Sequence, residues 1–85
     1  MTDQDIFMVL TSLRRNVEVG DVYTVGLICS KFKLMPDEAE AMLSEIEQKG
    51  YLKYQEPGVN PKFGSPTGNN WKLTFAGLEF VERNK

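Results

Sequence analysis

Residues 24–52 read TVGLICSKFKLMPDEAEAMLSEIEQKGYL, and this stretch decides the fold. Its first half predicts a short amphipathic helix, because Thr24 is a favourable N-cap and the apolar residues after it recur at helical spacing. Pro36 ends that helix no later than Met35, since a proline disfavours the α conformation in the residue before it. Pro36 also suits the first position of a second helix, and Gly50 suits the position just after its end. The stretch therefore predicts two short helices joined by a tight turn and followed by a strand.

Both of these helices carry an apolar face that must pack against a core. The face of the first helix is formed by Val25, Ile28, Cys29 and Phe32. On the second helix, four apolar residues fall within about 80° of arc, namely Ala39, Met42, Leu43 and Ile46. Leu34, in the turn between the helices, is expected to fill the core beneath them.

Two strands and a last helix are predicted after this stretch. Residues 51–55 alternate in the manner of a strand, and residues 71–74 form the next one. Between them lies a connection rich in Pro, Gly and Asn at residues 56–70, EPGVNPKFGSPTGNN. It is far longer than the usual hairpin loop of about 2–5 residues, and we expect residues 57–69 to be the most mobile part of the chain. Thr74 is the predicted N-cap of a final helix at residues 75–84.

The N-terminal segment predicts one more helix. Thr2 and Asp5 have the spacing of a capping box, and an apolar stripe follows at helical spacing, formed by Ile6, Val9, Leu10, Leu13 and Val17. Arg14 and Arg15 fall in the last turn of that helix, where cations suit the helix dipole. Residues 22–23 are β-prone and predict a very short strand.

This order of elements is that of a winged helix-turn-helix, and two motifs strengthen the resemblance. Residues 46–52, IEQKGYL, resemble the "L-E-x-x-G-hydrophobic-hydrophobic" exit from the recognition helix of MarR-like regulators. Residues 73–77, LTFAG, resemble the "L-T-x-x-G" exit from their wing. The resemblance covers residues 3–84, but the long dimerisation helices of true MarR proteins are absent, so the chain resembles minimal winged-helix domains.

The resemblance implies an α+β fold with a three-helix core, a β-hairpin wing and a C-terminal helix. A single domain is expected over residues 1–85, because a chain of this length builds one modest core. Within that domain the helix-turn-helix would occupy about residues 24–50 and the wing about residues 51–74, with residues 56–70 as a long wing loop.

Composition excludes several classes of function. The chain has 85 residues and no histidine, and its one cysteine, Cys29, lies on an apolar helix face. Without histidine, without a paired thiol and without a phosphate-binding glycine loop, we expect no enzyme activity, no cofactor and no metal. No apolar run is long enough to span a membrane, and the N-terminus is acidic. We therefore expect a cytoplasmic protein with no membrane association.

The fold resemblance implies duplex DNA as the partner and a role as a small transcriptional regulator. On the exposed side of the second helix of the pair, Ser44 and Gln48 could hydrogen-bond base edges. Phosphate contacts would come from lysines spread over the turn, the strands and the loop, namely Lys31, Lys33, Lys53, Lys62 and Lys72.

Charge argues for a second function. The net charge is −2, whereas dedicated nucleic-acid binders are usually basic. Residues 36–50 hold five acidic side chains against one basic side chain, and such a helix would be repelled by DNA phosphates. The alternative is a winged helix that does not bind DNA and captures a protein partner through helix 36–50.

Two apolar residues fall outside the predicted core stripes. Met8 lies opposite the stripe of the first helix, and Phe80 shares a face with Ala76 on the last helix, away from Leu78 and Val81. These positions predict a homodimer whose contacts include Met8 and Phe80.

Overall fold

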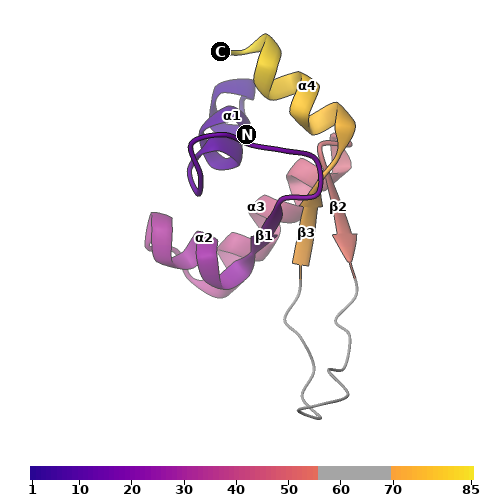
Figure 1. Ribbon diagram of the computed structural model, residues 1–85. Helices are drawn as coiled ribbons and strands as arrows, with labels where there is room; N and C mark the ends of the chain where they lie inside the picture. The colour runs from indigo at the N-terminus through magenta and orange to yellow at the C-terminus, as the bar shows by residue number, and fades with distance from the viewer. Residues whose placement is uncertain (56–69) are drawn as a thin grey trace.

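The computed structural model describes residues 1–55 and 70–85 of the chain. Within these ranges lie four helices and a three-stranded antiparallel sheet, which make up an α+β domain. In chain order the elements are α1 (Asp3–Thr11), β1 (Val22–Thr24), α2 (Val25–Phe32), α3 (Pro36–Gln48), β2 (Leu52–Gln55), β3 (Asn70–Leu73) and α4 (Phe75–Arg83) (Figure 1).

Threonines begin three of the helices, as predicted. The hydroxyls of Thr2, Thr24 and Thr74 each accept a hydrogen bond from the backbone N–H three residues further on, at 3.0–3.1 Å. Each bond satisfies one of the N–H groups that the first turn of a helix leaves unpaired. Helix α3 begins at Pro36 as expected, and its first turn is closed by Glu38, whose carboxylate accepts from the backbone N–H of Met35 at 3.3 Å.

The ends of α2 and α3 are fixed by residues in the left-handed conformation. Lys33 closes α2 with a φ of 56°, so this helix ends before Met35, as predicted. Gly50 follows α3 with a φ of 87° and donates to the Glu47 carbonyl at 2.8 Å. Tyr51 then donates to the Ile46 carbonyl at 3.4 Å. This pattern is a Schellman motif, and it turns the chain from α3 directly into β2.

The sheet has the order β1-β3-β2, with β3 in the centre. The antiparallel pairing predicted for residues 51–55 and 71–74 is confirmed. The first strand, Leu52–Gln55, begins one residue later than predicted, and the second, Asn70–Leu73, is displaced by one residue toward the N-terminus. The short strand predicted at residues 22–23 is confirmed as well, and it pairs with β3. The prediction for residues 56–70 was wrong at Asn70, which belongs to β3, while residues 56–69 lie outside the described part of the chain.

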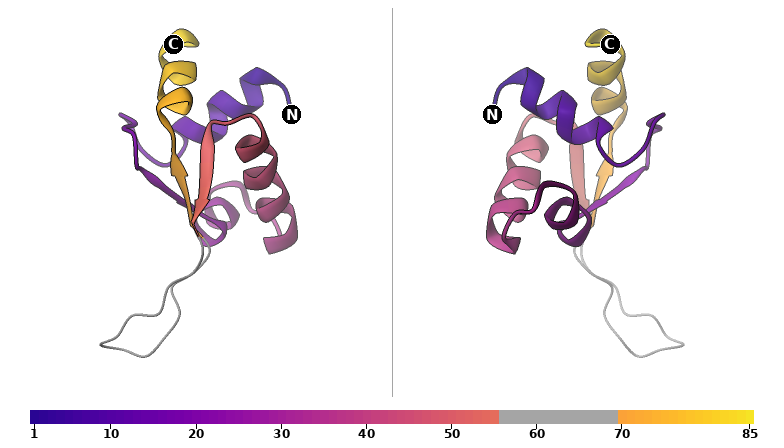
Figure 2. Two further views of the ribbon diagram at one scale, coloured as in Figure 1. Left: turned by 90° about the vertical axis from the view of Figure 1, so that its right-hand side faces the viewer. Right: turned by 90° about the vertical axis from the view of Figure 1, so that its left-hand side faces the viewer.

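The core lies between the sheet and the helices, and α1 and α3 lie on the same side of the sheet (Figure 2). Much of the predicted core is confirmed. Predicted core residues that are 0–3% exposed are Ile6, Val9, Leu10, Ile28, Ala39, Leu43, Ile46 and Val81. The sheet adds two large aromatic side chains, Tyr23 and Trp71, which are 0% and 2% exposed. Both come from short strands, where alternation gives a much weaker pattern than a helical stripe.

Helix α1 is shorter than predicted. It ends at Thr11, so Arg14 and Arg15 lie beyond it and not in its last turn. The Thr11 hydroxyl donates to the Phe7 carbonyl at 2.8 Å, and the Ser12 hydroxyl donates to the Val9 carbonyl at 2.7 Å. Side chains of this type compete with backbone N–H groups for the carbonyls of the preceding turn, which favours helix termination.

The prediction that Phe80 points away from the core was wrong. Phe80 is 2% exposed, and its ring stacks on that of Tyr51 with a centroid distance of 4.5 Å. Gly77 allows this contact, because a Cβ atom there would lie 2.3 Å from the Tyr51 carbonyl oxygen. The glycine thus lets α4 approach the start of β2 closely enough to bury Phe80. Met8 is 52% exposed, as predicted.

Candidate nucleic-acid interface

Strands β2 and β3 have two chemically different faces. On the face toward the helices, Leu52 pairs with Leu73 and Tyr54 with Trp71, and three of these four side chains are 2% exposed. Alternation places the intervening residues on the opposite face. We call these four residues the outer sheet face: Lys53, Gln55, Asn70 and Lys72.

Two lysines stand directly opposite one another on the outer sheet face. Lys53 and Lys72 are register partners, and both are exposed. Like charges in this position destabilise a sheet. Within residues 1–55 and 70–85, no acidic side chain forms an ion pair with either of them. Among the described residues, the lysine pair, Lys53 and Lys72, therefore carries positive charge that no acidic side chain compensates.

The described neighbours of the lysine pair on the outer sheet face are polar but uncharged. Gln55 and Asn70 are the next register partners along the same face, so two amide side chains follow the two ammonium groups. Lys53, Tyr54, Gln55 and Lys72 line a shallow hollow. Ammonium and amide groups donate hydrogen bonds, and such donors are the groups that contact phosphate and sugar oxygens in nucleic-acid complexes.

Helix α3 presents a different chemistry. Its buried side carries Ala39, Leu43 and Ile46, each 0% exposed. The opposite side, which we call the free face of α3, carries Asp37, Glu40, Ala41, Ser44 and Gln48. All of these are exposed except Ser44, which is half-buried. No lysine or arginine belongs to this free face.

Three of the five acidic side chains in α3 are engaged within the protein. Glu38 accepts from the backbone N–H of Met35, as described above. Glu45 lies 2.9 Å from the amino group of Met1. Glu47 accepts from the indole Nε1–H of Trp71 at 3.1 Å. The free face itself carries two acidic side chains, Asp37 and Glu40.

The bond between Glu47 and Trp71 also fixes α3 against the sheet. A second link comes from Thr74, whose hydroxyl donates to the Gly50 carbonyl at 2.6 Å and whose backbone N–H donates to the Tyr51 carbonyl at 3.0 Å. The end of α3, the start of β2 and the start of α4 thus meet at one point. This junction sets the direction in which the outer sheet face and the free face of α3 point relative to each other.

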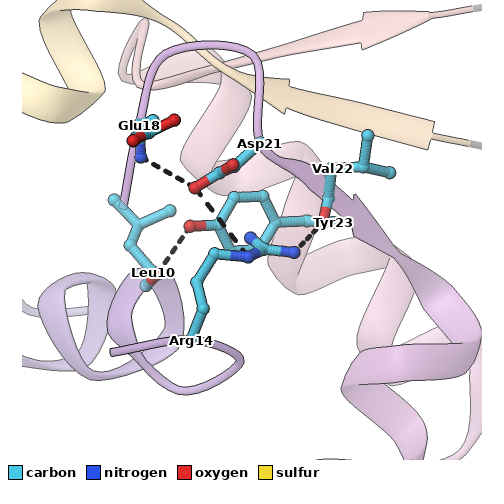
Figure 3. A network of polar contacts seen from close by, with 6 residues as sticks. All are labelled: Leu10, Arg14, Glu18, Asp21, Val22 and Tyr23. Carbon is cyan, nitrogen blue, oxygen red and sulfur yellow. Dashed lines mark hydrogen bonds and ion pairs between the residues drawn. The ribbon is translucent and has the colours of Figure 1, made fainter. Parts of the chain in front are cut away.

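A further polar cluster joins the segment after α1 to β1 (Figure 3). The Tyr23 hydroxyl donates to the Leu10 carbonyl at 2.5 Å, and the Arg14 guanidinium lies 5.1 Å from the centroid of the Tyr23 ring. Arg14 also donates to the Val22 carbonyl at 2.9 Å and lies 3.8 Å from the Asp21 carboxylate. Because β1 is an edge strand, this guanidinium covers a carbonyl that a second chain could otherwise pair with.

Burial raises the pKa of the Tyr23 hydroxyl to about 12, and the nearby Arg14 charge opposes part of that rise. The group thus stays protonated wherever the protein is folded at ordinary pH and donates to Leu10 throughout. Sequence reasoning missed this cluster because it placed Arg14 in the last turn of α1. The spacing of Arg14 and Asp21 across a glycine bend carried no pattern that would have indicated it.

The other candidate residues lie in separate places. Lys31 is exposed in the last turn of α2, and Lys33 is the exposed residue that ends it. Helix α2 packs mainly on α3 and β1 and lies apart from β2 and β3 (Figure 1). Ser44 and Gln48 lie on the free face of α3, and Lys62 lies outside the described residues. The structure therefore brings Lys53 and Lys72 together and leaves Lys31 and Lys33 as a second, distant group. Cys29 is half-buried and packs against the core, as predicted.

Comparisons with models of protein families, with curated proteins and with solved structures find no match for this chain. In the described ranges no helix has the length and apolar character needed to cross a bilayer. Those same residues contain no cluster of three or more side chains suited to holding a metal ion. The geometry and charge of the outer sheet face and of the free face of α3 are therefore the basis for assigning a function.

Proposed function

We propose that this chain is a cytoplasmic winged helix-turn-helix module that binds duplex DNA and acts as a small regulator of transcription. Two features of the architecture support it. The elements follow the order α1-β1-α2-α3-β2-β3-α4, and the early strand β1 pairs with β3 to give the sheet order β1-β3-β2. In this proposal α2 and α3 are the helix-turn-helix, and β2 and β3 are the strands of the wing.

The observation that carries the proposal is the lysine pair. Lys53 and Lys72 face each other at a cost to the sheet, and no acid in the described ranges relieves that repulsion. A bound phosphate would relieve it. Affinity for DNA comes largely from the neutralisation of phosphates by lysine and arginine, which releases condensed counterions. Lys53 and Lys72 are therefore the proposed phosphate contacts. Lys31 and Lys33, at the end of α2, are not part of this pair, and Lys62 lies outside the described residues.

Titration of a fluorescein-labelled duplex of mixed sequence with the protein tests the proposal. At about 50 mM salt, where phosphate attraction is strong, we expect a saturable rise in anisotropy with a Kd no weaker than about 100 μM, the weak end of non-specific DNA affinity. A matched control is the double variant Lys53→Ala/Lys72→Ala, which removes both charges and should weaken binding. The absence of any rise with the unmodified protein up to about 100 μM would refute DNA binding.

A protein-interaction module is the second candidate, and one observation favours it. Asp37 and Glu40 stay unengaged on the free face of α3 within the described structure, and Met35, next to them at the start of the helix, is 67% exposed. An exposed apolar side chain beside two acids suits a basic partner with an apolar anchor. In that case DNA binding is undetectable, and Asp37→Lys/Glu40→Lys abolishes capture of the partner while leaving the fold intact.

A further inference from the structure

Positive and negative charge are separated onto two surfaces of this domain. The outer sheet face carries Lys53 and Lys72 and no acid, whereas the free face of α3 carries Asp37 and Glu40 and no base. We infer that a bound duplex lies against the outer sheet face while α3 stays outside the major groove. The protein would then bind the sugar–phosphate backbone without reading base sequence. This inference rests on the proposed function and specifies how that function is carried out.

Charge makes α3 unsuited to the major groove, because a helix fills that groove closely. With its side chains an α-helix is about 10–12 Å across, and the major groove of B-DNA is about 12 Å wide. A helix inserted there has phosphates close on both sides. Asp37 and Glu40 would lose solvent between those phosphates, and no cation on the free face of α3 could compensate them. Insertion would bring two carboxylates close to the phosphates that flank the groove.

The outer sheet face has the opposite properties. Neighbouring strands lie about 4.8 Å apart, so the long side chains of Lys53 and Lys72 can converge on one phosphate or reach two adjacent ones. Gln55 and Asn70 continue this row of donors along the same two strands. The remaining outward residues of the sheet are Val22 and Thr24 on β1, which add no charge. A donor-rich surface without carboxylates fits a polyanion along its whole length.

Two charge-reversal variants that change the net charge by the same amount test whether the duplex lies against the outer sheet face. One variant is Lys53→Glu/Lys72→Glu on the outer sheet face, and its control is Lys31→Glu/Lys33→Glu at the end of α2. A third variant, Ala41→Trp, places a bulky ring at an exposed position on the free face of α3. Each is titrated against duplexes of several unrelated sequences at one low salt concentration. Because Trp71 is buried and bonded to Glu47, its fluorescence reports whether the lysine variants remain folded.

We expect Lys53→Glu/Lys72→Glu to weaken the affinity for duplex DNA at least tenfold. The control Lys31→Glu/Lys33→Glu should weaken it at most threefold, and Ala41→Trp should leave it unchanged. Affinities for the unrelated duplexes should agree within threefold. A tenfold or larger loss in Ala41→Trp overturns the inference, because it places α3 in the groove, whatever the lysine variants do. Equal losses in the two charge-reversal variants also overturn it, because net charge alone then explains them. If the unmodified protein binds no duplex, the proposed function itself fails, an outcome that none of the variants can imitate.

Discussion

At the scale of single residues, the lysine pair is expected to lower the stability of the sheet while it strengthens binding to DNA. Lys53 and Lys72 repel each other across β2 and β3, so replacing one by an acid turns a repulsive cross-strand contact into an attractive one. We expect Lys53→Glu to raise the free energy of unfolding by about 0.2–1 kcal/mol relative to Lys53→Gln, the range for such cross-strand contacts. Urea denaturation at low salt measures it, and the difference should shrink as salt screens the charges. A Lys53→Glu protein less stable than Lys53→Gln would show that the repulsion is absent.

Tyr23 gives the second prediction at this scale. Its folded-state pKa of about 12 lies above the ordinary tyrosine value of 10.0, so the folded state holds this proton more tightly than the unfolded chain does. The stabilisation is complete below about pH 10, where both states are protonated, and it is lost as the pH rises toward 12. We expect the free energy of unfolding to fall between pH 9 and pH 11 more steeply in the unmodified protein than in Tyr23→Phe. Parallel slopes in urea titrations of the two proteins would contradict this.

Tyr23→Phe also tests the polar cluster near neutral pH. It removes the donor to the Leu10 carbonyl, which is then buried without that partner. We expect a loss of about 1–3 kcal/mol, the usual cost of a buried polar group left unsatisfied. Thermal unfolding at pH 7 measures it, and an unchanged midpoint would mean that the hydroxyl contributes nothing.

At the scale of elements, local chemistry in the sequence predicts where most helices begin and end. Thr2, Thr24 and Thr74 act as caps because a hydroxyl can satisfy the first turn whatever the rest of the chain does. Gly50 ends α3 because it adopts a positive φ without strain. The end of α1 was mispredicted because the apolar stripe continues to Val17, which is buried although it lies beyond the helix. A residue can thus belong to the core without belonging to the helix whose period it continues.

The burial of Phe80 could not be predicted by the same means. A helical wheel separates it from Val81, but the wheel does not show that a second surface, the start of β2, reaches the other side of α4. That contact depends on Gly77 and Tyr51, which are distant in sequence and meet only in the folded domain. The outer sheet face was predictable from the alternation of β2 and β3. The register that places Lys53 opposite Lys72 was not predictable, because the sequence of residues 56–70 does not show where the connection ends and the second strand begins.

Thr74 connects three elements, and its replacement tests that junction. Its hydroxyl accepts from Gly77 at 3.0 Å and donates to Gly50 at 2.6 Å. We expect Thr74→Ala to cost about 1–3 kcal/mol, because a cap and a second hydrogen bond are both lost. Thr74→Ser keeps the hydroxyl and should cost less than about 1 kcal/mol, since only a methyl group is removed. Equal losses in the two variants, measured by urea denaturation, would show that the hydroxyl is not the stabilising group.

At the scale of the whole molecule, the homodimer prediction has to be revised. Phe80 is buried within the domain, so its replacement would unfold the protein and report nothing about association. Met8, 52% exposed on α1, remains the candidate contact. If the protein dimerises there, sedimentation at tens of micromolar should show a dimer that Met8→Glu converts to monomer. A monomer in the unmodified protein, or a dimer that survives Met8→Glu, excludes this interface.

Net charge is a poor guide to the partner of this domain. The chain is acidic overall, at −2, yet its outer sheet face contains no acid, and the free face of α3 carries two of the five carboxylates of that helix. A polyanion responds to the local arrangement of charge within about 8–10 Å, the distance over which salt screens it near physiological strength. The arrangement on the sheet therefore outweighs the average over the chain.

The salt dependence of duplex binding by the unmodified protein and by Lys53→Ala/Lys72→Ala shows whether the lysine pair holds the phosphate backbone. Each phosphate neutralised contributes about −0.9 to the slope of log Kobs against log salt concentration. We expect a linear plot for the unmodified protein and a slope shallower by about two for the double variant. Two proteins that bind with identical slopes, or an unmodified protein whose binding does not respond to salt, would contradict the claim that Lys53 and Lys72 hold the phosphate backbone.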